Sequence, residues 1–64
     1  MYLVVATSGR GPRKFWTGRT LGRWPEYVRD RARAIRLKKG AAEQMAAAFN
    51  ALRTPVHWEV EEDG

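Results

Sequence analysis

One segment of this chain has the composition of a stable helix, and it limits what the rest can fold into. Residues 40–53, GAAEQMAAAFNALR, are mostly strong helix formers. Thr54-Pro55 marks the expected end, because the residue before a proline disfavours helical torsion angles. One helix covers only one face of a sheet. We therefore expect a small α+β domain, residues 1–64, with a single Ala-rich helix packed on one face of a small sheet.

The helical segment has one apolar face. Its expected stripe consists of Ala42, Met45, Phe49 and Leu52, with Ala41 and Ala48 beside it. Alanine in such a face lets a helix lie close to a sheet.

Three segments have the composition of strands. Residues 2–7, YLVVAT, and 14–17, KFWT, are rich in β-branched and aromatic side chains, and the glycines and proline of SGRGP between them are typical of a turn. We expect these two strands to form an antiparallel hairpin. Residues 56–60, VHWEV, alternate in polarity, which predicts a half-buried strand. The inward side chains are expected to be Val56, Trp58 and Val60, and the outward ones His57 and Glu59.

The middle of the chain is ambiguous. Residues 17–24, TGRTLGRW, contain two glycines and are expected to form a turn or a bulged continuation of the second strand. Trp24-Pro25-Glu26 is typical of a helix start, so we expect a short helix over 25–33 and a short strand near 34–38. The expected order is β-β-(short helix or strand)-α-β, with an antiparallel or mixed sheet.

Charge is unevenly distributed along the sequence. Residues 10–39 hold eleven Lys or Arg against two acids, whereas an acidic tail at about 59–64 holds four acids. The basic middle favours a polyanion or an acidic protein surface as partner. The tail is expected to be solvated, or else to lie over the basic patch of its own chain or of a neighbour. In the second case, removing residues 61–64 should tighten polyanion binding.

Several function classes have little support. The chain has no cysteine and one histidine, His57, so thiol chemistry and zinc-finger sites are excluded. We expect no enzyme activity, no metal site and no cofactor, because no nucleophile, base and orienting group are predicted to converge. The longest apolar run is residues 3–6, which favours a cytoplasmic protein with no membrane contact.

The aromatic pair Phe15-Trp16 carries the main functional prediction. Alternation along a strand sends the two side chains to opposite faces, so one is expected to meet the helix and the other to lie on the open face. An exposed aromatic flanked by arginine can stack on an unpaired base or anchor on another protein. The alternative is that both are buried by the loop after Gly18 and by Trp24.

The candidate binding residues are basic and aromatic side chains of the hairpin and the middle segment. They are Arg10, Arg13, Lys14, Trp16, Arg19, Arg23, Trp24, Arg29, Arg33, Arg36 and Lys38.

The order of these motifs resembles a group of known proteins. Y-L-V near the start, then F-W-T-G, a second tryptophan, an Ala-rich helix and a closing W-E-V resemble small single-domain proteins encoded by phages and prophages. The chain is also similar to the three-stranded arm-binding domains of tyrosine-type integrases, from which the final VHWEVEED departs. The resemblance implies a binder of DNA or an inhibitor of host machinery, including anti-CRISPR proteins, and it assigns no residue a role.

Two functions are therefore expected. The first is a small basic module that binds DNA or RNA through the arginines and an exposed aromatic. The alternative is a phage-type accessory or inhibitor protein that binds an acidic surface of a host protein complex. An open strand edge also favours a homodimer formed by edge pairing.

Overall fold

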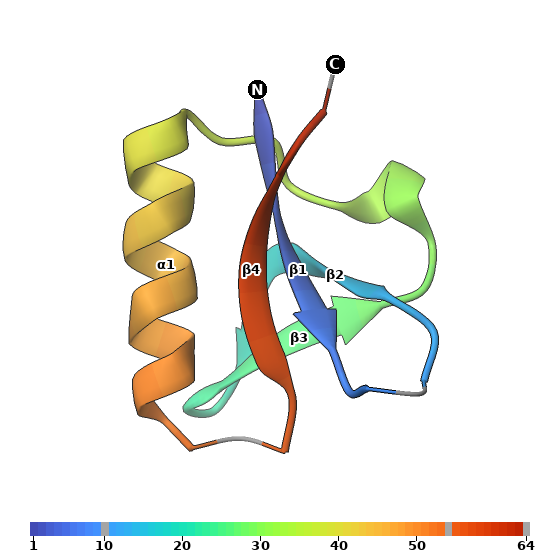
Figure 1. Cartoon of the computed structure of the whole chain (residues 1–64), viewed down its shortest axis with the longest axis vertical. Coiled ribbons are helices and arrows are strands. Elements are labelled where there is room, and N and C mark those ends of the chain that lie inside the picture. Colours follow the sequence, from blue (N-terminus) through green and yellow to red (C-terminus); the bar gives the residue numbers. More distant parts are fainter. Residues whose placement is uncertain (10, 54, 64) are drawn as a thin grey trace.

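A computed structural model describes residues 1–9, 11–53 and 55–63 (Figure 1). One helix lies against a twisted four-stranded sheet, which confirms the small α+β fold. In chain order the elements are β1 (Tyr2–Thr7), β2 (Lys14–Leu21), β3 (Trp24–Val28), a 3-10 turn (Arg31–Arg33), α1 (Lys39–Ala51) and β4 (His57–Glu62).

The sheet is antiparallel throughout, with strand order β3-β2-β1-β4. Strand β1 lies in the centre and pairs with β4 along its whole length, from Tyr2 opposite Glu62 to Thr7 opposite His57. Its pairing with β2 is short, because only Val5 and Ala6 have partners there. Strands β1 and β2 therefore diverge beyond this contact.

The predicted helix over 25–33 is wrong, because β3 occupies Trp24–Val28. Strand β3 pairs with β2 through a two-residue turn at Gly22-Arg23, where only Gly22 has a positive φ, as a type II′ turn requires. Pro25 is tolerated because β3 is an edge strand. The bulged continuation of the second strand is confirmed, since the register shifts between Trp16 and Thr20.

The expected strand at 34–38 is reduced to a single bridge. Leu37 exchanges two backbone hydrogen bonds with Tyr2, at 2.7 and 2.9 Å. The amide of Ile35 donates to the carbonyl of Trp16 at 3.0 Å. This segment thus bridges the gap where β1 and β2 diverge, which leaves it too few partners to form a full strand.

The main core lies between the sheet and α1. Trp16 and Trp58 pack on Phe49, with ring centroids 4.9 and 5.0 Å apart. The predicted stripe is confirmed, since Ala42 and Phe49 are buried and Met45 and Leu52 pack against the same cluster. Ala46 is a further buried residue of α1. The two alanines expected beside the stripe, Ala41 and Ala48, are exposed. Trp58 faces inward as predicted, with Val56 and Val60 packed against the same cluster, while His57 and Glu59 are exposed.

A second, smaller cluster lies on the opposite face of the sheet. It contains Leu3, Val5, Phe15 and Ala34. The segment after β3 crosses this face, so Phe15 is buried although no helix covers it. Alternation thus separates Phe15 from Trp16 as expected, and both are buried as the alternative held. The covering elements differ from that alternative, because α1 covers Trp16 and the segment after β3 covers Phe15, while Trp24 is exposed.

Candidate nucleic-acid interface

The turn between β2 and β3 presents two large apolar side chains to solvent. Leu21 and Trp24 lie directly opposite each other on either side of Gly22-Arg23. Leu21 is 63% exposed and Trp24 is 49% exposed. We call residues 18–24 the hairpin tip. In Figure 1 it lies at the end of the molecule opposite the two termini.

Trp24 differs from the other two tryptophans. Trp16 and Trp58 are buried and have aromatic neighbours, whereas Trp24 belongs to neither core cluster. Within residues 1–9, 11–53 and 55–63, its indole has no ring or cation contact. The exposed aromatic predicted at Phe15 or Trp16 is therefore found at Trp24.

Two arginines flank these apolar side chains. Arg19 and Arg23 are exposed, and neither forms an ion pair with any residue that the structure describes. The backbone at Arg19 is held by the protein core, because the indole Nε1 of the buried Trp16 donates to the Arg19 carbonyl at 2.9 Å. A guanidinium held on an ordered backbone, without a carboxylate partner, is suited to phosphate binding.

The bulge that carries the hairpin tip is fixed by further contacts. Thr17 Oγ1 donates to Glu26 Oε1 at 2.8 Å, across the two strands. Gly18 has φ +90, and a Cβ there would lie 2.8 Å from Ile35 Cδ1. Only glycine combines this φ with so close an approach. The hairpin tip is therefore a supported projection of the sheet.

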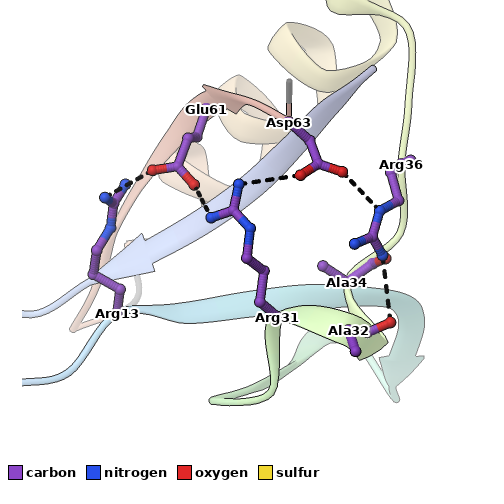
Figure 2. A network of polar contacts seen from close by, with 7 residues as sticks. All are labelled: Arg13, Arg31, Ala32, Ala34, Arg36, Glu61 and Asp63. Carbon is purple, nitrogen blue, oxygen red and sulfur yellow. Dashed lines mark hydrogen bonds and ion pairs between the residues drawn. The ribbon is translucent and has the colours of Figure 1, made fainter.

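The acidic end of the chain forms ion pairs with arginines outside the hairpin tip (Figure 2). Its carboxylates alternate with guanidinium groups in a row that we call the ion-pair ladder: Arg13, Glu61, Arg31, Asp63 and Arg36. Arg13 and Glu61 are 2.8 Å apart, and Arg36 Nε lies 2.9 Å from Asp63. Arg36 also donates to the carbonyls of Ala32 and Ala34.

The ladder corrects the expectation of a solvated tail. Residues through Glu62 belong to β4, and alternation along that strand places Glu61 on the face that Arg31 crosses. The alternative, a tail lying over the basic patch of its own chain, is what the structure shows for Glu61 and Asp63. Hydrogen bonds from Arg36 and then Arg31 hold the pKa of the Asp63 carboxyl below its ordinary value. Hydrogen bonds to Glu61 and Asp63 raise the pKa of the Arg31 guanidinium.

The predicted site residues thus fall into separate groups. Arg19, Arg23 and Trp24 come together at the hairpin tip. Arg13 and Arg36 belong to the ladder, and Trp16 lies in the core.

The remaining predicted residues are dispersed. Lys14 lies over the Tyr27 ring at 5.3 Å, and Arg33 approaches Glu26 at 3.8 Å. Arg29 is exposed after β3, and Lys38 precedes α1. Arg10 lies outside the described residues.

Two features of the surface were missed from the sequence. Leu21 was not singled out, although LGRW has the Gly-X pair of a type II′ turn and would place residues 21 and 24 opposite each other. The ladder was the second missed feature. The spacing of Glu59, Glu61 and Asp63 could have indicated it, because these residues lie on one face if the last strand continues past Val60.

The two sheet edges differ in their protection. On β4, the side-chain amide of Asn50 donates to the Trp58 carbonyl at 3.0 Å and accepts from the Trp58 amide at 2.8 Å. On β3, Pro25 offers no amide donor. The expected homodimer by edge pairing remains a prediction, and it would meet an obstacle at each of these positions.

The part of the chain that the structure describes holds no pocket and no cluster of three metal-ligating side chains. No described helix is long and apolar enough to cross a membrane. Comparison with family models, curated proteins and solved structures finds no match to this chain.

Proposed function

We propose that this protein binds nucleic acid through the hairpin tip. One observation carries the proposal: the hairpin tip exposes the indole of Trp24 together with Arg19 and Arg23, two cations without carboxylate partners among the described residues. Exposed aromatic rings next to free arginines provide stacking and phosphate contacts together.

The distribution of acids supports this choice of surface. The ladder pairs Glu61 and Asp63 with arginines at the C-terminal end of β4, away from the tip. The acid on β3, Glu26, accepts a hydrogen bond from Thr17 and lies near Arg33. The hairpin tip itself contains no acid, so an approaching phosphate meets positive charge there.

Fluorescence anisotropy with labelled oligonucleotides tests the proposal. We expect binding at about 50 mM salt, with an affinity that falls log-linearly as salt rises. Arg19→Gln and Arg23→Gln should each weaken binding and lower the salt slope by about one. Lys39→Gln removes the same charge at the start of α1 and should change the slope less. Absence of binding to DNA and RNA, or equal effects of all three variants, would overturn the proposal.

A second function is favoured by the apolar pair at the tip. Leu21 and Trp24 together, next to arginines, have the composition of a protein–protein hot spot. This agrees with an accessory or inhibitor protein of phage type that binds a host complex. Such binding should depend weakly on salt and be lost in Trp24→Ala. If host protein is captured equally by the wild type and by Trp24→Ala, this function is not supported.

A further inference from the structure

We propose that the hairpin tip receives an unpaired base, so that its ligand is single-stranded rather than duplex nucleic acid. This inference rests on the proposed function and names the ligand class of the same site. It depends on how Trp24 is presented and on how the tip is held.

The presentation of Trp24 suits stacking. Leu21 and Trp24 form a directly opposed pair, so their side chains lie on the same face of the hairpin. Neither belongs to a core cluster, and Trp24 has no ring partner among the described residues. Together they make an apolar platform, with a flat indole beside an aliphatic side chain. A base that stacks on this platform is removed from water and contacts both the Trp24 indole and the Leu21 side chain.

The charges beside the platform match a strand backbone. Arg19 is two residues from Leu21 along β2, and Arg23 lies within the turn. Both are exposed and unpaired among the described residues. A base on the indole would therefore have guanidinium groups close to its flanking phosphates. Stacking of this kind tolerates any base, because every base has an aromatic face.

A duplex fits this surface less well. Bases within a duplex stack on their neighbours and present only their edges in the grooves. Binding along a duplex is strengthened by each further phosphate that a Lys or Arg side chain neutralises. Here Arg13, Arg31 and Arg36 are paired with carboxylates in the ladder.

The tip is also held in place rather than free to wrap around a groove. The Trp16–Arg19 and Thr17–Glu26 hydrogen bonds fix the bulge to the sheet. Gly18 packs directly against Ile35. Because these contacts hold the bulge, the indole is preorganised to stack on a base that is already unpaired.

Three labelled ligands of equal length test the inference at one salt concentration: a thymidine strand, its duplex with adenosine, and a strand of abasic residues that keeps the phosphates. We expect the thymidine strand to bind tightest. Trp24→Ala should weaken that binding by about 5- to 150-fold and leave the abasic strand unaffected. Trp24→Phe keeps an aromatic face and should retain most of the affinity. Circular dichroism verifies that both variants fold, as expected for a side chain outside the core.

The outcomes separate this inference from the proposed function. Equal binding of duplex and single strand, unchanged by Trp24→Ala but weakened by Arg23→Gln, would overturn the inference and leave nucleic-acid binding intact. Equal binding of the thymidine and abasic strands would also overturn it. Failure of all three ligands to bind would overturn both proposals, as would a Trp24-dependent protein partner found without any strand binding.

Discussion

The indole Nε1 of Trp16 donates a hydrogen bond to the carbonyl of Arg19, at 2.9 Å. Trp16 is only 6% exposed and packs edge-on against Phe49 of α1. Arg19 lies in the exposed part of β2, within the bulge between Trp16 and Thr20. One buried side chain therefore links the helix core to the hairpin tip.

Replacing Trp16 should loosen the hairpin tip as well as the core. In Trp16→Phe the Arg19 carbonyl loses its donor, which should lower the free energy of unfolding by about 1 kcal/mol in addition to the loss of packing. Phe49→Leu is the matched control, since it opens a cavity beside Trp16 and keeps the hydrogen bond. NMR relaxation of the backbone amides of residues 19–23 should show added motion in Trp16→Phe and not in Phe49→Leu. Equal motion in both variants would contradict a specific role for the hydrogen bond.

The glycine at the bulge should not be replaceable. Gly18→Ala places a Cβ 2.8 Å from Ile35 Cδ1 at a φ of +90, so we expect a loss of more than about 1 kcal/mol in urea unfolding. Ile35→Val in the same chain removes the clashing atom and should restore part of the loss. Gly40→Ala, in α1 with open space around it, should instead be neutral or stabilising. A neutral Gly18→Ala would show that the bulge is not constrained.

Parts of this fold were predictable because their patterns are local. The composition of residues 40–53 indicates α1, and the alternation from Val56 to Val60 indicates β4. Strand β3 was not predictable in this way. Trp24-Pro25-Glu26 has the residue types of a helix start, and only pairing with β2 at an open edge favours the extended form.

The candidate site was predicted only in part, because some of its features are local in the sequence and others depend on distant contacts. Trp24, Arg19 and Arg23 follow from the interleaving of aromatic and basic residues near the glycines. Which arginines stay free could not be predicted, because that depends on contacts between segments far apart in the sequence. Arg31 and Glu61 are thirty residues apart and meet only because the chain crosses the sheet after β3.

Acid should weaken the ladder through Asp63. Its folded pKa is depressed by Arg36 and Arg31, so the contribution to stability is present above the unfolded aspartate value of about 3.9 and is lost as pH falls through the lower folded value. Asp63→Asn should therefore reduce the change in unfolding free energy measured between neutral pH and acid. Glu62→Gln, at an exposed position of β4, is the control. The change in unfolding free energy between neutral pH and acid should be larger in Glu62→Gln than in Asp63→Asn. Equal pH dependence in the two variants would contradict a specific contribution from Asp63.

Removing the amide that covers the β4 edge should both destabilise the domain and promote self-association. Asn50→Ala leaves the outward amide and carbonyl of Trp58 without these two hydrogen bonds, which should lower the free energy of unfolding by about 1–2 kcal/mol. The β4 edge then lacks the amide that covers it, so sedimentation velocity should show concentration-dependent dimers that the wild type forms less readily. Gln44→Ala, on the exposed side of α1, is the matched control. If Asn50→Ala remains as monomeric as Gln44→Ala, the side chain stabilises β4 without protecting its edge.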